Sequence, residues 1–538
     1  MKKVVVLLLF AAIAASIMSV SCTDNPSVSE VQQPEENLAD YTIIFYGHGG
    51  GNLDKDIISN LSQFYLAEKG SYEHVKIAAQ YKYSTKENLT NTLQLYVDYG
   101  MLSQQDYETF LTMGGQTVRT IIDPQQGNEQ LVADIYGLPD CEIANPDSLT
   151  NFINWAAQAC PARKYILILS DHGEGYLPHS DLAMTPSATR TIIQDDGHSS
   201  DAFSVFSLAA AIKSADIRPN VIYMDACLMN CIEYQFELKD LCDYIVSSSY
   251  LVPGAGGEYT SLVNLLASEQ DLEQALVKYC EAAVANWDRL YKSPNIKKDD
   301  EGTPVSYYDM TVTRTAQLES FGTKFRQFTD ILLDAYQNGG EDVRAAIDNC
   351  TSKTLKAHYN QPHYDLPKYL KSIGNAVPTY FSNQFLEEME SAYNNCIVKQ
   401  NYSEYLTKNN CTVDCSILLG CNGSYDIRNM TEVRDAEGNS VLIDTSTITI
   451  YWNGSGEWRD FEVVHFDNGE SLSVQSNLTN FTWISTGEAT YEQLCFDRTV
   501  GWSRWIKANQ TEPTSWSVSS MKFTLDPLAV AYFMGETK

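Results

Sequence analysis

The chain has 538 residues, of which 37 are Lys or Arg and 69 are Asp or Glu, so its formal net charge is −32 at pH 7. This length predicts more than one domain and enough interior for a large core. So acidic a composition, without any basic cluster, argues against nucleic acid as a partner.

The N-terminus has the pattern of an export signal. Lysines at positions 2 and 3 precede an apolar stretch, Val4 to Met18, that is too short to span a bilayer. The string Ser19-Val20-Ser21-Cys22 resembles a bacterial lipobox, although Ser19 stands where leucine is usual. We therefore expect residues 1–21 to be removed and Cys22 to carry a lipid that anchors the protein to a membrane or cell surface. Ordinary signal cleavage with secretion is the alternative.

Residues 22–40 are rich in Ser, Pro, Gln and Glu, which is typical of a flexible tether. Residues 41–285 then alternate strand-like and helix-like segments, which predicts an α/β sandwich with a mainly parallel sheet. The predicted strands are Tyr41–Tyr46, Val75–Tyr81, Thr117–Ile122, Tyr165–Leu169, Val221–Met224 and Tyr244–Ser249. The predicted helices are Leu53–Lys69, Ser148–Ala159, Ser204–Ala215 and Glu269–Trp287.

Two further regions follow. Residues 286–405 are mainly helical, with Ala316–Gln337 and Phe385–Val398 the clearest amphipathic pieces. Residues 406–538 are β-rich, and their strand-like runs are Ser446–Trp452, Phe461–His465, Phe481–Ser485 and Ser520–Leu525. We expect residues 286–405 to complete the preceding α/β unit and residues 406–538 to form a β-rich C-terminal domain.

A reactive side chain follows each of two apolar strands. His172 comes after Tyr165–Leu169, and Cys227 comes after Val221–Met224. Because parallel strands deliver their ends to one edge of a sheet, the thiol and the imidazole are expected to meet there as a cysteine nucleophile with its base. The alternative is a buried structural thiol and an ordinary loop histidine.

The residue pattern after Cys227 adds detail to this site. Leu228–Leu241 has helix-like apolar spacing, so Cys227 is expected near a helix N-terminus, where the partial positive charge lowers the pKa of a thiol. His172 is followed by Gly173-Glu174-Gly175, a loop in which the backbone can pass close to a substrate. The amides of Gly173 and Cys227 are candidates for an oxyanion hole.

These residues resemble the clostripain family of cysteine peptidases, which belongs to the caspase-like clan. Asp225-Ala226-Cys227-Leu228-Met229 with Glu233 resembles the nucleophile motif, and His172-Gly173 resembles the histidine motif. The opening strand departs from the family pattern because it runs into Gly47-His48-Gly49-Gly50-Gly51. The stretch after Pro253-Gly254 also departs, since its nearest aromatic residue is Tyr259.

The resemblance implies a caspase-like α/β/α sandwich and endopeptidase activity after a basic P1 residue, Arg or Lys, in protein or peptide substrates. The acidic residue credited with reading P1 corresponds to Asp225, and a carboxylate in a pocket of low dielectric constant pairs well with such a cation. Alternatively, Asp225 only caps the following helix.

Other sequence features offer competing sites. His48 also follows a β-rich run and lies among glycines, but no GxSxG elbow accompanies it, so we interpret it as a loop residue at the same sheet edge. Cys411, Cys415 and Cys421 lie close together, but with no nearby histidine they do not predict a zinc site. No metal ligand set is predicted and no cofactor is required. Calcium stays an alternative although no EF-hand-type loop is present.

The interval between His172 and Cys227 is longer than one crossover helix needs. It contains Arg190-Thr191 just ahead of Asp195-Asp196, and the resemblance implies self-cleavage after a basic residue in this interval. The alternative for the loop is an exposed segment with a solvated arginine. The alternative for the whole protein is a catalytically inactive, peptidase-like lipoprotein that binds a partner through its β-rich C-terminal region.

Overall fold

A computed structural model describes residues 38–49, 53–83, 117–122, 134–138, 141–176, 192–195, 201–292, 297–299, 302–354, 363–419 and 491–509. It also describes single positions between 90 and 124 and short strands between 424 and 485. The chain divides into residues 1–38 and residues 39–538, and every element named below belongs to the second unit. The predicted signal, Cys22 and nearly all of the tether lie outside the described residues.

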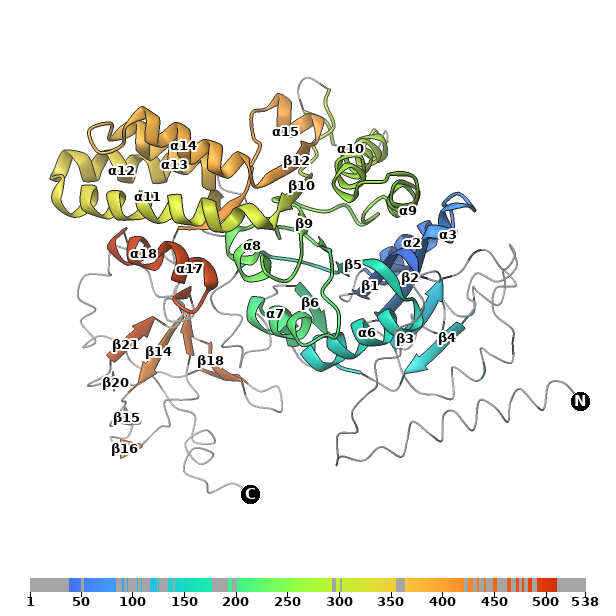
Figure 1. Ribbon diagram of the computed structural model, residues 1–538. Coiled ribbons are helices and arrows are strands. Elements are labelled where there is room, and N and C mark those ends of the chain that lie inside the picture. Colours follow the sequence, from blue (N-terminus) through green and yellow to red (C-terminus); the bar gives the residue numbers. More distant parts are fainter. Residues whose placement is uncertain are drawn as a thin grey trace, which may run out of the picture. The chain divides into compact units, whose positions relative to one another are not determined.

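A nine-stranded sheet with the order β12-β10-β9-β8-β5-β1-β2-β3-β4 forms the centre of this unit (Figure 1). The strands from β9 to β2 run parallel, whereas β10 and β12 at one edge and β3 and β4 at the other pair antiparallel. All the strands predicted between residues 41 and 249 belong to this sheet, so the prediction of an α/β unit with a parallel centre is confirmed. The strands are β1 (Ala39–His48), β2 (Val75–Lys82), β3 (Thr117–Ile122), β4 (Asp134–Leu138), β5 (Ala162–Ser170), β8 (Val221–Asp225), β9 (Tyr244–Ser247), β10 (Asp309–Arg314) and β12 (Ile397–Tyr402).

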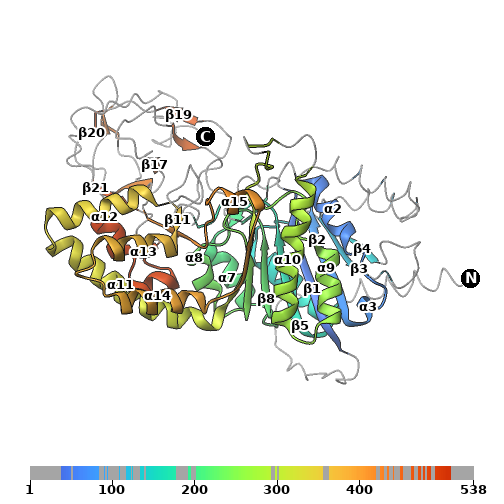
Figure 2. The ribbon, with the colours of Figure 1, turned by 90° about the horizontal axis from the view of Figure 1, so that it is seen from above.

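Helices cover both faces of the sheet, as the two views show (Figures 1 and 2). Alternate residues of β1 enter the two cores: Ile44 and Tyr46 join one, and Ile43 and Phe45 join the other. The first core includes α6 (Pro146–Ala159), α7 (Val205–Lys213) and α8 (Ile232–Leu238). The second includes α2 (Asp54–Gln63), α3 (Ser71–His74), α9 (Tyr259–Ser268) and α10 (Leu272–Leu290). The predicted α/β/α sandwich is therefore confirmed.

Local sequence explains where these helices start. Asn145 caps α6 by accepting a hydrogen bond from the Asp147 amide at 2.8 Å, and Pro146 occupies the first turn, where its missing N–H costs nothing. Asp271 caps α10 in the same way through the Glu273 amide at 2.9 Å. The predicted helix Glu269–Trp287 therefore begins at Leu272. The preceding helix α9 was not predicted.

The helical region after β10 packs together with the C-terminal part of the chain. Its elements are the short 3₁₀ helix η4 (Thr315–Gln317), α11 (Leu318–Asn338), α12 (Glu341–Lys353), β11 (His363–Asp365), α13 (Leu366–Ala376), α14 (Asn383–Asn394) and α15 (Glu404–Lys408). Strand β13 (Ser416–Leu418) pairs antiparallel with β11. Helix α17 (Cys495–Val500), helix α18 (Ser503–Asn509) and the turn between them bury Phe496, Trp505 and Trp502 in the same core as α11.

The expectation of a β-rich domain over residues 406–538 stays a prediction, but parts of that region pack with the preceding helices. Residues 415–419 and 491–509 contribute buried side chains to the core that contains α8 and α11, where Phe496 packs on Phe236 and Trp502 packs on Phe325. Long-range packing of this kind leaves no local signal in the sequence.

Short strands account for the rest of the described chain. β14 (Ser424–Arg428) pairs with β17 (Thr449–Tyr451) and β21 (Thr482–Ser485), and β15 (Val433–Arg434) pairs with β16 (Ser440–Val441) and β20 (Asn477–Leu478). Two hairpins are β18 (Glu462–His465) with β19 (Ser471–Ser473), and β6 (Ile192–Asp195) with β7 (Asp201–Phe203). The predicted strand Ser520–Leu525 lies outside the described residues. Of the helices described, none combines the length and the hydropathy needed to cross a bilayer.

Candidate active site

The ends of β5 and β8 bring the predicted catalytic residues to one edge of the sheet. The two strands pair in parallel with Ser170 opposite Asp225. His172 and Cys227 each lie two residues beyond this last pair, so they occupy equivalent positions in adjacent loops. Both side chains are partly exposed. The register of the sheet therefore places His172 and Cys227 in adjacent loops at one edge of the sheet. Their pairing as nucleophile and base stays a prediction.

Gly173 makes the contact between the two loops very close. A Cβ atom built on Gly173 would lie 2.5 Å from the Cys227 carbonyl oxygen, 2.9 Å from the Ala226 Cβ and 3.0 Å from the Met229 sulfur. Gly175, with φ of +73°, approaches the Leu228 carbonyl in the same manner. The glycines after His172 were expected to admit a substrate. The structure instead shows them packed against the turn that carries Cys227.

The turn after β8 is not the beginning of a helix. Helix α8 starts only at Ile232, and Cys227 lies in a turn whose next residue, Leu228, has φ of 64°, in the left-handed region. Hydrogen bonds to the strand-end of β9 hold this strained turn: the Leu228 amide donates to the Tyr250 carbonyl at 2.8 Å, and the Asn230 amide donates to the Ser248 carbonyl at 2.8 Å.

The expected lowering of the Cys227 pKa by a helix N-terminus is therefore wrong. Burial raises the pKa of this thiol, and the negative charges of Asp225 and Glu174 add to the effect. The Val252 amide opposes them by donating a hydrogen bond to the Cys227 sulfur at 3.3 Å. Burial therefore favours the neutral thiol over the thiolate at this position.

Asp225, the last residue of β8, is buried and accepts hydrogen bonds from several donors. The Tyr259 hydroxyl and the Gly257 amide bond one oxygen, the latter at 3.2 Å, and the Tyr223 hydroxyl bonds the other at 3.2 Å. Burial raises the pKa of Asp225, while the hydrogen bonds, including one from Ser170, lower it. The helix-capping alternative is excluded because α8 begins at Ile232. None of the ion pairs formed by the described residues involves Asp225.

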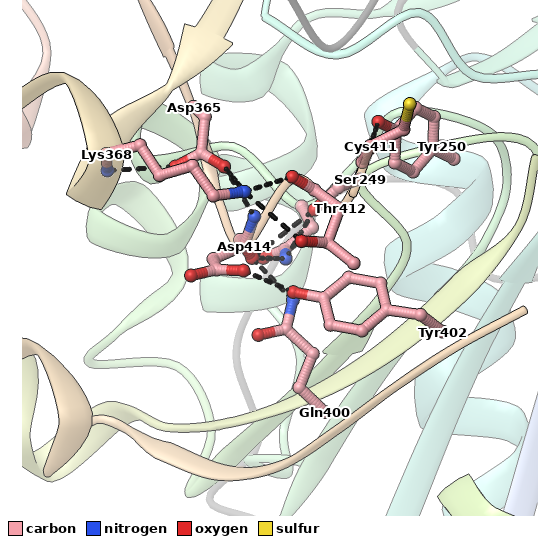
Figure 3. Close-up of polar contacts among 10 residues, drawn as sticks. Ser249, Tyr250, Asp365, Lys368, Gln400, Tyr402, Cys411, Thr412 and Asp414 are labelled. Carbon is pink, nitrogen blue, oxygen red and sulfur yellow. Dashed lines mark hydrogen bonds and ion pairs between the residues drawn. The ribbon is translucent and has the colours of Figure 1, made fainter. Parts of the chain in front are cut away.

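A polar network supports the loop that follows β9 (Figure 3). The Tyr250 hydroxyl donates to the Cys411 carbonyl, and the Asp414 carbonyl accepts from Asn230 at 2.8 Å and from Gln400 at 2.7 Å. Cys411 and Cys415 take part in ordinary packing and hydrogen bonding here, and Cys421 lies outside the described residues. This network links residues 411–414 to the turn that carries Cys227 through the Tyr250 backbone.

His48 lies at the same sheet edge, but not in a loop. It is the last residue of β1 and is fully buried, and its Nδ1 lies 2.8 Å from the Lys82 carbonyl oxygen. Arg190 and Thr191, the predicted cleavage site, lie outside the described residues.

Sequence reasoning missed several residues that shape this edge. Tyr223 and Gly257 hold Asp225, the Val252 amide donates to the Cys227 sulfur, and a buried pair joins Lys82 to Asp195. The one sequence signal for these residues was Lys82, which follows the predicted strand Val75–Tyr81. A lysine there indicates a buried acidic partner, since buried lysines are rarely found unpaired.

A parallel-centred α/β/α sandwich with Cys and His at adjacent strand ends defines the class of cysteine peptidases with a caspase-like fold. The sequence profile of the clostripain family matches residues 100–423, which is more than half of the chain. The chain therefore belongs to the clostripain family and is a cysteine peptidase. A search of curated proteins found no match.

Two solved structures of C11 proteases are similar to this chain. A secreted C11 cysteine protease from Bacteroides thetaiotaomicron, in complex with an irreversible peptide inhibitor, is 16% identical with a TM-score of 0.52, over 86% of this chain and 99% of that chain. An inactive zymogen C11 protease from Parabacteroides distasonis is 13% identical with a TM-score of 0.47, over 86% of this chain and 98% of that chain. The first likeness supports the caspase-like fold.

Proposed function

We propose that this protein is an endopeptidase that cleaves after Arg or Lys through a dyad of Cys227 and His172. The observation that carries the proposal is the close packing of Gly173 on the Cys227 carbonyl. This contact joins residues 172–175, the histidine loop, to residues 227–230, the cysteine turn. His172 takes the thiol proton as the sulfur attacks the scissile carbonyl, and then gives that proton to the departing amine. Water hydrolyses the thioester and restores the thiol.

The amides of Gly173 and Cys227 are proposed to bind the oxyanion. Their support is that the two amides belong to the two loops that contact each other at Gly173. Negative charge would develop on the scissile carbonyl oxygen when the Cys227 sulfur attacks the carbonyl carbon. Labelling with an arginine-based electrophilic peptide tests the dyad. Wild type should be labelled at Cys227, and His172→Ala should slow labelling by about 10²-fold to 10⁴-fold. Cys411→Ala, at another partly exposed thiol, is the matched control and should label like wild type. Unlabelled Cys227 in a folded wild type would contradict the peptidase mechanism.

Asp225 is proposed as the anion that reads P1. It is a buried carboxylate close to Cys227 with hydrogen-bond donors around it but no cationic partner among the described ion pairs, so a bound guanidinium or ammonium would supply the missing charge. Asp225→Asn keeps the shape and removes the charge. We expect kcat/KM for peptides with Arg or Lys at P1 to fall by about 100-fold or more, and the preference for these residues over Gln to disappear.

Tyr259→Phe is the control for a purely positional role of Asp225, because it removes a hydrogen bond from Asp225 without changing its charge. This variant should keep the preference for basic P1 residues. Equal loss of preference in both variants would mean that Asp225 acts only by holding the Gly257 loop.

Self-processing after Arg190 is proposed as the activation step. Arg190 is the sole Arg or Lys between Leu177 and Thr191, and it precedes strand β6, which lies beside the histidine loop. In the precursor Arg190 would fill the Asp225 pocket, and cleavage of Arg190–Thr191 would free it. Mass spectrometry of wild type and Cys227→Ala decides this. A cut that persists in Cys227→Ala would reveal another protease, and a fully active but uncut wild type would refute the activation role.

Export with lipid attachment at Cys22 is proposed from the signal pattern of the first residues. Wild type should partition into the detergent phase of a cell extract and Cys22→Ala should not. Equal partitioning of the two proteins would leave ordinary secretion as the route.

A further inference from the structure

A buried ion pair lies at the same edge of the sheet as the candidate active site. The Lys82 ammonium, at the end of β2, is 2.8 Å from each carboxylate oxygen of Asp195, at the end of β6. Both side chains have no exposed surface. The Cys141 carbonyl accepts a further hydrogen bond from Lys82 at 2.9 Å, and the Ile143 amide donates one to Asp195 at 2.9 Å.

Such a pair is expensive to bury, because each ion loses several kcal/mol of hydration that only good geometry offsets. Burial raises the pKa of Asp195, but the hydrogen bonds from Lys82 and Ile143 outweigh it, so the pKa is lowered and the carboxylate stays charged. The neighbouring His48 ring contacts the Lys82 carbonyl and belongs to the same cluster. Through Asp195, the Lys82–Asp195 pair ties the end of strand β6 to the end of strand β2.

Asp195 ends β6, a short strand outside the main sheet. β6 pairs with β7 and, through Ile192, forms an isolated antiparallel bridge to Gly173. Ile192 and Ile193 are buried, although Ile193 has φ of 54°, an unfavourable conformation for a β-branched residue. Gly173 thus lies between two partners: the Cys227 turn and strand β6.

Cleavage of Arg190–Thr191, on which this inference rests, would make Thr191 the new N-terminus directly before β6. The two fragments would stay together, because β8 of the second fragment pairs with β5 of the first in the same sheet. β6 itself would lose its covalent tie to the histidine loop, and chain ends fray unless something fastens them. We propose that the Lys82–Asp195 pair fastens the new N-terminal strand beside Gly173, so that the histidine loop keeps its position after processing.

The test separates this fastening from self-cleavage. A Cys227→Ala chain receives the recognition sequence of an unrelated site-specific protease in place of residues 185–190, so the cut can be made or withheld. Lys82→Met with Asp195→Asn removes both charges and keeps an acceptor for the Ile143 amide. The measurement is amide hydrogen exchange of peptides that cover residues 173 and 192–195.

We expect the double variant to exchange like its parent while the chain is uncut, and at least tenfold faster in these peptides after the cut. The control neutralises the exposed pair Lys278–Glu269, with 2.6 Å between Nζ and Oε1, by Lys278→Met and Glu269→Gln, and should change neither form. Equal exchange of the double variant and its parent in the cut form, or the same increase in cut and uncut forms, would overturn the proposal.

Activity gives a second readout in the chain with Cys227 intact. The processed double variant should lose about tenfold in kcat with a smaller change in KM, because the reacting groups shift and the P1 pocket does not. If the double variant does not fold, Asp195→Glu replaces it, since this substitution keeps the charge and adds one methylene group. It should change hydrogen exchange and kcat in the same direction, but by less. A wild type that does not cut itself at Arg190 would refute the proposed activation, while the exchange experiment would still decide the fastening.

Discussion

Substitution of Gly173 by alanine tests the contact between the histidine loop and the cysteine turn. The added methyl group would lie 2.5 Å from the Cys227 carbonyl oxygen, whereas ordinary contacts begin at 3.4 Å. The carbonyl belongs to a turn held by the Leu228 and Asn230 amides, so it cannot rotate away cheaply. The two loops must therefore separate by about 0.9 Å, and a misplacement of about 1 Å between reacting groups costs about 10²-fold in rate.

We expect Gly173→Ala to lower kcat/KM about 100-fold, mainly through kcat, and to cost about 1–3 kcal/mol of stability from overpacking. Gly70→Ala is the matched control, because a Cβ there meets nothing within 4 Å and its φ of −65° suits alanine. The assay is hydrolysis of an Arg-containing peptide by both variants, with thermal unfolding to verify the fold. A folded Gly173→Ala enzyme within threefold of wild type would refute the close contact in the active state.

Two further predictions concern titration. Because burial raises the pKa of Cys227, its alkylation by iodoacetamide in the free enzyme should be slow at pH 7 and still increase above pH 9, and a plateau between pH 5 and 8 would show a preformed thiolate instead. Glu233 has a pKa raised to about 7 by burial, and its Oε2 has no hydrogen-bond partner among the described residues. A carboxyl whose pKa is raised on folding stabilises the protein below its unfolded pKa and loses that contribution as pH rises through 7. Glu233→Gln should therefore gain about 2–3 kcal/mol relative to its parent between pH 5 and pH 8, measured by urea unfolding of Cys227→Ala proteins. A pH-independent difference would contradict the buried, titrating carboxyl.

The sequence by itself predicted the parallel-centred sheet, the covering helices and the family. Short apolar runs indicate buried strands, and local motifs identify the loops that follow them. His172, Cys227 and Asp225 follow such runs directly, so their meeting at one edge required only that β5 and β8 pair in parallel. Their catalytic roles, like the cleavage site and Cys22, stay predictions.

Tertiary structure decided what surrounds these residues. Helical spacing after Cys227 suggested a helix at once, but backbone hydrogen bonds to the β9 loop hold a left-handed turn there and delay α8 to Ile232. The contact of β6 with Gly173 joins residues with no shared local pattern. The return of Trp502 to the core of α11 likewise joins segments far apart in the chain. The pKa of a thiol and the partner of a buried lysine depend on which distant groups displace water, and only the folded chain brings those groups together.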